Sequence, residues 1–166
     1  MKTAIAFFLC LAACARLSFA ADTVITRETI SSKNGIVLQG TDRLVTPGSF
    51  KPPVEITIVA KTDSTNLRIG YAADQVIFNW EAGREELRVD GGPANGLHKA
   101  GAGSIPVREY VVIKWWVTPT GQSISVNNKV RFTHEGDYSK IDRPVSIFPG
   151  AGSFVTVKSV QVKPLK

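Results

Sequence analysis

Few side chains in this sequence belong to the types that hold metals or attack substrates. The two histidines, His98 and His134, are far apart in the chain, and both cysteines lie within the first 14 residues. No group of residues has the spacing of a zinc site. Ser104 and Ser125 have no neighbouring base to activate them, and no phosphate-binding loop or nucleophile elbow occurs. The sequence therefore argues against zinc chemistry and serine-type hydrolysis.

Acidic and amide side chains in the expected loops are the remaining candidates for a metal. Asp90, Asn95, Asp137 and Asp142 could offer oxygen ligands to calcium, but their spacing does not resemble a calcium-binding loop. Asp and Asn also close tight turns through their own side chains. We expect turn chemistry at these positions and no cofactor, with calcium as the alternative.

One short stretch places charged side chains on one side of an expected strand. Arg84, Glu86 and Arg88 share a side because successive side chains alternate across a strand. Glycoside hydrolysis requires two carboxyl groups at a fixed separation, and Glu86 is only a weak candidate for a catalytic acid. Weak ion pairs on an exposed strand explain the same pattern. The catalytic residues are therefore left unassigned.

Carbohydrate binding asks for less than catalysis, namely an aromatic face for the sugar ring and a few fixed polar groups for its hydroxyls. Alternation along residues 110–118 predicts that Trp115 faces the core and Trp116 the outside. The same rule predicts that Trp80 is in the core. If their strands are neighbours, one outer surface carries the candidate ligand-binding residues Trp116, Tyr110, Lys114, Asn79, Arg84, Glu86 and Arg88.

The elements that must position these residues are strands. From residue 23 onward β-branched and aromatic residues alternate with polar ones, and no window shows the 3.6-residue period of a helix. The pattern predicts an all-β protein, and the even spacing of short strands favours an antiparallel two-sheet β-sandwich over a small barrel. The expected strands cover residues 24–27, 36–38, 43–45, 54–61, 67–71, 76–80, 85–89, 110–118, 123–126, 130–134, 145–148 and 154–162.

One hairpin has a register that can be argued from its residues. A three-residue loop, Asn127–Lys129, would pair Val126 with Val130 and Ile124 with Phe132. A two-residue turn at the two asparagines would instead pair core positions with solvent positions. We therefore expect the longer loop, in which Asn tolerates left-handed backbone dihedrals.

The last expected strand changes phase in its middle. The valines of residues 155–157 alternate in one phase, and those of residues 160–162 alternate in the other. A β-bulge between Lys158 and Ser159 would return both pairs to the core.

The N-terminal residues have the pattern of a cleavable, bacterial-type export signal. Lys2 supplies a positive charge, and the apolar or small run that follows is too short to span a bilayer. Ser18 and Ala20 are the small residues that a signal peptidase reads. We expect residues 1–20 to be removed as a signal peptide and residues 21–166 to form a single domain, exported to the periplasm or the exterior.

A second interpretation of this segment stays open. Leu11–Cys14 has the form of a lipobox, in which an acylated Cys14 would anchor the protein to a membrane. In either case the folded domain has no disulfide, since Cys10 and Cys14 are the only cysteines.

The charge of the chain is mildly basic and scattered. Removing residues 1–20, with Lys2 and Arg16, lowers the formal net charge from +6 to +4. No basic run resembles a nucleic-acid-binding arm. Ordinary solubility explains this charge, and a preference for acidic glycans is the alternative.

The order of these segments resembles that of the concanavalin A-like jelly rolls. The resemblance rests on residues 66–71, 85–89, 110–117, 121–127 and a last strand that closes on residues 160–165. It is closest to the bacterial laminin G-like and 3-keto-disaccharide-hydrolase-like domains. It implies a curved sandwich with a concave face or loop rim that often meets sugars.

The resemblance also implies what to look for in an enzyme of this kind. Glucanases of this architecture carry three acids on one strand face in the pattern Glu-x-Asp-x-x-Glu. This chain has Glu86, Arg88 and Asp90 at alternate positions instead, so the central acid is absent.

Three hypotheses follow for the function. The first is a secreted or periplasmic carbohydrate-binding, lectin-like protein whose partner is a polysaccharide or oligosaccharide, acidic glycans included. The second is a hydrolase of oligosaccharides with Glu86 as its acid, and the third is a structural or protein-interaction module of the cell envelope. We expect no nucleic-acid partner, and no membrane contact unless Cys14 is acylated.

Overall fold

The computed structural model describes residues 28–165, which form twelve β-strands. The expected signal segment, both cysteines and the strand expected at residues 24–27 lie outside these residues. Within them, no helix is long and apolar enough to cross a membrane. The strands are β1 (Glu28–Gln39), β2 (Leu44–Val45), β3 (Val54–Thr62), β4 (Leu67–Gly70), β5 (Gln75–Phe78), β6 (Leu87–Asp90), β7 (His98–Lys99), β8 (Val111–Thr118), β9 (Gly121–Val126), β10 (Lys129–Glu135), β11 (Ser146–Phe148) and β12 (Phe154–Pro164).

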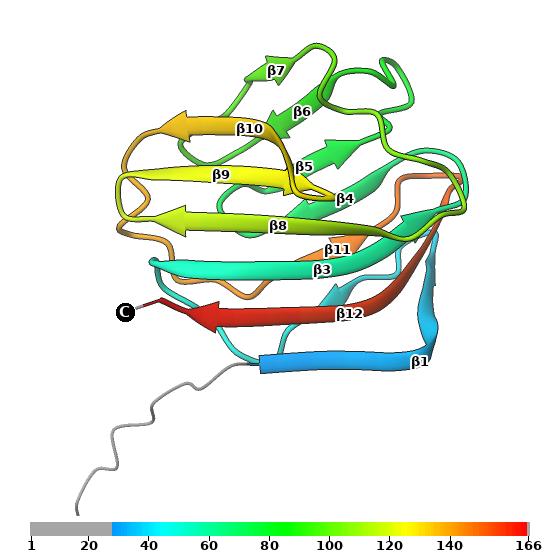
Figure 1. Cartoon of the computed structure of the whole chain (residues 1–166), viewed down its shortest axis with the longest axis horizontal. Coiled ribbons are helices and arrows are strands. Elements are labelled where there is room, and N and C mark those ends of the chain that lie inside the picture. Colours follow the sequence, from blue (N-terminus) through cyan, green and yellow to red (C-terminus); the bar gives the residue numbers. More distant parts are fainter. Residues whose placement is uncertain (1–27, 166) are drawn as a thin grey trace, which may run out of the picture.

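The strands form two six-stranded antiparallel sheets that pack face to face. Sheet A has the order β1-β12-β3-β8-β9-β10, and sheet B has the order β2-β11-β4-β5-β6-β7. In Figure 1, sheet A is the front layer and β4, β5, β6 and β11 lie behind it. The predicted all-β, two-sheet sandwich is confirmed. Strand β7 and the first half of β1 were not expected from the sequence, because neither shows a clear alternation of apolar and polar residues.

The core lies between the sheets and follows the alternation seen in the sequence. Strand β3 alternates buried and half-buried residues along its whole length, and β8 does so over seven of its eight residues. Ile56 of β3 pairs with Trp115 of β8, and Trp115 is 1% exposed. The predicted core position of Trp115 is confirmed. Each such apolar side chain contributes by leaving water, at about 25 cal/mol per Å² of buried apolar surface.

The predicted β-bulge in the last strand is also confirmed. The register of β12 against β3 shifts between Val157 and Ser159, so the valines on both sides of the shift are buried. A second irregularity lies beside it, where the register of β1 against β12 shifts between Ser31 and Ile36. Strands β1 and β12 therefore both depart from regular pairing next to each other, around Lys158.

The expected three-residue loop of the β9–β10 hairpin is wrong. Val126 pairs with Lys129 across a two-residue turn, in which Asn127 and Asn128 have φ angles of 48° and 64°. These positive values suit the tight turns that match the twist of a hairpin. The pairing of Val126 with Val130 does not occur, and Val130 is 58% exposed.

A bulge explains how the shorter turn still buries the right residues. The register of β10 shifts between Val130 and Phe132, after which Phe132 pairs with Ile124 as expected. One extra residue in a strand returns later side chains to the other face. The bulge in β10, and not a longer loop, therefore places Phe132 opposite Ile124.

The expected core position of Trp80 is wrong as well. Strand β5 ends at Phe78, and Asn79 follows with a φ of 50°. Alternation of side chains holds only for extended backbone, so this left-handed residue interrupts it. Asn79 turns inward and is fully buried, while Trp80 is half-buried on the outside of sheet B.

Candidate functional site

The predicted ligand-binding residues are divided between the two sheets. Tyr110 precedes β8, and Lys114 and Trp116 lie on the outer face of β8 in sheet A. Arg84, Glu86 and Arg88 lie in or just before β6 of sheet B. Strands β6 and β8 are not neighbours, so the expectation of one shared surface is wrong. The chain crosses from one sheet to the other between these strands, and period-two alternation carries no information on which sheet a strand joins.

Asn79 does not belong to either outer face. Its side-chain oxygen accepts a hydrogen bond from the Ile105 backbone N–H at 2.8 Å, and its amide nitrogen donates to the Ile105 carbonyl at 3.0 Å. With 0% exposure, Asn79 fixes the loop that contains Ile105. It has a structural role in place of the expected binding role.

Trp80 is the centre of a cluster on the outer face of sheet B. The Arg88 guanidinium lies 4.6 Å from the centroid of the Trp80 ring, a cation–π distance. The His98 ring meets Trp80 edge-on, with centroids 5.9 Å apart. His98 Nδ1 in turn contacts the Glu86 carboxylate. The indole is therefore held by the Arg88 guanidinium and the His98 ring, which come from two neighbouring strands, and part of it stays accessible.

A chain of hydrogen bonds extends from Arg88 across the same face. Arg88 Nε donates to both carboxylate oxygens of Asp90, at 2.9 and 3.0 Å, and Gln75 donates to Asp90 at 2.8 Å. Arg68 donates to Gln75 at 3.2 Å and lies 3.5 Å from Glu81. The Arg88, Asp90 and Arg68 side chains are only 32%, 24% and 20% exposed. Side chains held this way lose little further freedom when a ligand binds.

A small hollow lies beside Trp80. Its volume is about 300 Å³, and it is lined by Gly83, Arg84, Glu85, Glu86 and Ala100. Gly83 faces the indole so closely that a Cβ at this position would lie 3.2 Å from the Trp80 ring. Gly83 therefore both lines the hollow and packs against the indole.

The carboxylates of this face are not arranged for hydrolysis of the glucanase type. Arg88 occupies the position of the central acid, and both oxygens of Asp90 accept bonds from Arg88. At the position of the third acid of that pattern, five residues after Glu86, the chain has Gly91. The second carboxyl group that such hydrolysis requires is therefore absent from its place in the pattern. The geometry suits recognition of hydroxyl groups better than proton transfer to a glycosidic oxygen.

The loop residues considered for calcium serve the backbone or an ion pair. Asn95 accepts a hydrogen bond from Gly91 N–H at 2.7 Å. The hydroxyl and backbone N–H of Ser139 both donate to Asp137, and these two bonds lower the pKa of the Asp137 carboxyl. Asp142 lies 3.5 Å from Lys51. Within residues 28–165, no three His, Cys, Asp or Glu side chains gather as a metal site would require.

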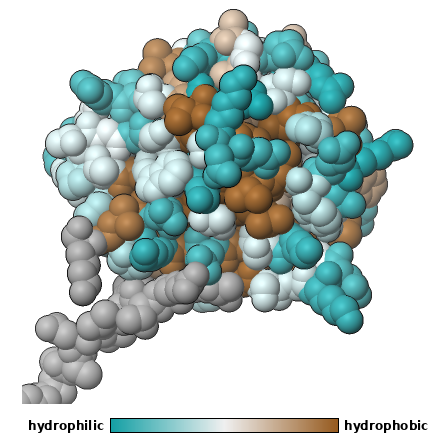
Figure 2. Space-filling model, viewed as in Figure 1, coloured by the Kyte–Doolittle hydropathy of each residue, from teal (hydrophilic) through white to brown (hydrophobic). Residues whose placement is uncertain are grey.

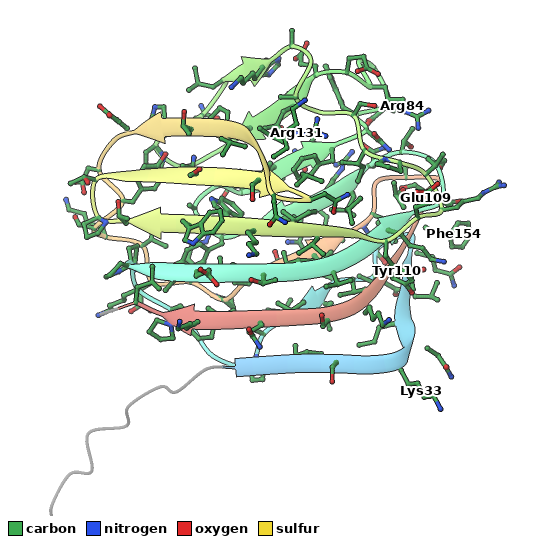
Figure 3. All side chains as sticks on the ribbon, in the orientation of Figure 1. Lys33, Arg84, Glu109, Tyr110, Arg131 and Phe154 are labelled. Carbon is green, nitrogen blue, oxygen red and sulfur yellow. The ribbon has the colours of Figure 1, made fainter. Side chains whose placement is uncertain are left out.

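The outer face of sheet A has a different character. Trp116 is half-buried, and its indole N–H donates to Glu55 at 2.7 Å, while Lys114 Nζ lies 5.9 Å from its ring centroid. Tyr110 is 39% exposed, and the ammonium groups of Lys61 and Lys158 lie 4.9 and 5.7 Å from its ring. Figure 3 shows Tyr110 at one end of this sheet. The expected outward position of Trp116 is confirmed.

Sequence reasoning missed several residues of the sheet B cluster, namely Trp80, His98, Gln75 and Arg68. Asn followed by Trp after an apolar run was the available signal for Trp80, because Asn readily adopts positive φ. Nothing local marks His98 or Gln75, whose roles depend on which strands pair.

Comparisons with known proteins agree with this architecture. No protein-family description and no curated relative matches the chain. Among solved structures, a Bacillus licheniformis β-glucanase has a TM-score of 0.57 at 9% identity and covers 78% of each chain. The Caenorhabditis elegans galectin LEC-6 has a TM-score of 0.55 at 14% identity and covers 81% of this chain and 99% of its own.

A third structure, the carbohydrate-binding module CBM66 from Bacillus subtilis, has a TM-score of 0.55 at 9% identity and covers 82% of this chain and 91% of its own. The protein has a concanavalin A-like fold. At these identities the likeness shows the fold alone. A lectin, a carbohydrate-binding module and a glucanase share this concanavalin A-like fold, so the fold does not choose between binding and hydrolysis.

Proposed function

We propose that this protein binds an oligosaccharide or polysaccharide on the outer face of sheet B. The observation that carries the proposal is the partly exposed Trp80 ring, held by Arg88 and His98 beside an open hollow. Aromatic rings bind the C–H faces of sugars, and neighbouring carboxylates, amides and guanidinium groups bind the hydroxyls. The fold neighbours described as a galectin and a carbohydrate-binding module support this choice.

The polar part of such a site comes from the linked side chains of Arg68, Gln75, Glu81, Arg88 and Asp90. Arg68 and Arg88 each share their charge with a carboxylate, so the face offers donors and acceptors without a strong net field. That balance favours a hydroxyl-rich ligand over a highly charged one. As a protein expected to be exported, it would meet such glycans outside the cytoplasm.

Hydrolysis is the second candidate, because Glu86 lines the hollow next to Trp80. In that case Glu86 would act as the general acid, a role worth a factor of about 10² to 10⁴ in rate. The fold neighbour described as a β-glucanase favours testing it. Arg88 at the position of the central acid argues against it.

The experiment compares Trp80→Ala with Trp116→Ala, a tryptophan on the opposite face, over a panel of soluble polysaccharides. Binding isotherms are measured together with sugar release. We expect Trp80→Ala to weaken binding at least about tenfold, since a stacking aromatic is a typical binding hot spot. Trp116→Ala should change it less than about twofold. Equal effects of the two variants would place the site elsewhere.

Glu86→Gln separates the two candidate functions. A binding protein should retain most of its affinity with this substitution and release no sugar from any substrate. Sugar release by the unchanged protein that is lost in Glu86→Gln would establish the hydrolase instead. Retention of a polysaccharide without products, unaffected by Glu86→Gln, supports the binding function.

A further inference from the structure

The outer face of sheet A carries several lysines that have no carboxylate partner among the residues that the structure describes. Lys33, Lys61, Lys114 and Lys158 belong to strands β1, β3, β8 and β12 of this sheet. Every ion pair found in residues 28–165 involves other residues. Glu55 is the one acid that β3, β8 and β12 place on this face, and it accepts the indole hydrogen bond of Trp116.

Two of these lysines converge on one exposed ring. Ala60 of β3 pairs directly with Val111 of β8. Lys61 follows Ala60 and Tyr110 precedes Val111, so the side chains of Lys61 and Tyr110 lie side by side. Lys61 also pairs with Thr156 of β12, two residues before Lys158. The ammonium groups of Lys61 and Lys158 both lie within 6 Å of the Tyr110 ring centroid. Like charges gathered in this way repel one another and attract anions.

A shallow groove continues from this cluster toward β1. Its volume is about 510 Å³, and the residues that line it are Ser31, Ser32, Lys33, Val59, Lys158 and Ser159. The groove lies where the bulges of β1 and β12 interrupt regular pairing next to each other. Figure 2 shows this face with hydrophobic residues near its centre, crossed by hydrophilic side chains. Figure 3 shows Lys33 and Tyr110 at the same end of the sheet.

We propose that this face is a second binding surface, which takes an acidic polysaccharide bearing sulfate or carboxylate groups. Ammonium groups of Lys33, Lys61 and Lys158 would bind its anionic groups, and the serine hydroxyls of the groove would bind its free hydroxyls. A ligand that alternates anionic and hydroxyl groups fits this lining. Single-stranded nucleic acids stack their bases on aromatic side chains, whereas none of the described residues that line the groove is aromatic. The surface is independent of the sheet B face.

The test measures binding of fluorescently labelled dextran sulfate and of uncharged dextran of equal length to the purified protein. We expect binding of dextran sulfate alone, weakening steeply with added salt. The triple variant Lys33→Gln/Lys61→Gln/Lys158→Gln should bind it at least about tenfold more weakly and with a smaller salt dependence. Thermal unfolding of the variant serves as the check that it folds, and each single substitution should give a partial loss.

The matched control removes the same charge elsewhere, in Lys51→Gln/Lys99→Gln/Lys140→Gln. This variant should weaken binding less than about threefold. Equal weakening in both triple variants, or no binding of dextran sulfate at 0.15 M salt, would overturn the proposal. Tighter binding of a DNA oligomer or of phosphatidylglycerol vesicles through the same three lysines would also overturn it and assign another polyanion. Trp80→Ala should leave dextran sulfate binding unchanged, so this result is separable from that for sheet B.

Discussion

On the outer face of sheet B, arginines hold carboxylates, whereas on the outer face of sheet A lysines gather around a tyrosine. Arg88 donates to both oxygens of Asp90, and Gln75 completes the carboxylate's contacts. Lys61 and Lys158 have the Tyr110 ring as their neighbour instead. Two faces of one sandwich, built with the same alternation, therefore present paired charges on sheet B and, on sheet A, lysines that take part in no ion pair within residues 28–165.

The difference follows from the chemistry of the two cations. The planar guanidinium of arginine matches a carboxylate in geometry and keeps its donors fixed, while the lysine ammonium is a strongly hydrated point charge on a flexible stem. A fixed network can discriminate ligands by shape. A field of lysines attracts any nearby polyanion and weakens with salt. The two faces are thus suited to different ligands.

The largest expected effect is on the free energy of unfolding, and it tests which side of β8 faces the core. Trp115→Ala should lower the free energy of unfolding by about 3 to 5 kcal/mol, because it removes a buried ring whose N–H donates to Gln122 at 2.7 Å. Trp116→Ala should cost clearly less, about 1 to 2 kcal/mol. Denaturant unfolding of both variants is the measurement, and a reversed ranking would invert the two sides of β8.

The next effect is a fall of stability at high pH, caused by the two buried tyrosines, Tyr71 and Tyr138. Burial raises the pKa of Tyr138 to about 12, and burial also raises that of Tyr71. Between pH 10 and 12 the folded protein keeps these protons while the unfolded chain releases them. Stability should therefore fall as the pH rises through this window, by at most about 1.4 kcal/mol per pH unit for each tyrosine.

Tyr138→Phe checks this pH dependence. The variant loses the Tyr138 contact to His134 Nδ1, which spans 2.7 Å, so it should be less stable at neutral pH. Its stability should nevertheless fall more slowly between pH 10 and 12. Denaturant unfolding at several pH values gives both quantities, and identical slopes for the two proteins would contradict the assignment.

The smallest effect compares the two outer faces directly. Asp90→Ala removes the acceptor of Arg88 and Gln75 and should cost about 1 kcal/mol, since these side chains are partly shielded from water. Lys158→Ala on sheet A should change stability by less than about 0.5 kcal/mol, because no carboxylate of residues 28–165 pairs with this ammonium. Thermal unfolding of both variants is the measurement. Equal losses of stability would contradict the proposed difference between the two outer faces.

The sequence alone determined the features that depend on neighbouring residues. The β class, the buried side of β3 and β8, the core position of Trp115 and the bulge before Ser159 all follow from alternation between adjacent positions. A bulge changes this local pattern visibly when valines lie on both sides of it. The bulge in β10 escaped prediction because Val130, an apolar residue, is exposed there.

Only the tertiary structure decided which residues meet. Trp80 left the expected core because one residue, Asn79, adopts a positive φ that satisfies hydrogen bonds to the distant Ile105. The pairing of β6 with β5 and β7 then brought Arg88 and His98 to the same ring. The candidate site was predicted in part, through Arg84, Glu86 and Arg88. Its centre was not, because contacts between strands distant in sequence are set by sheet order, which alternation does not encode.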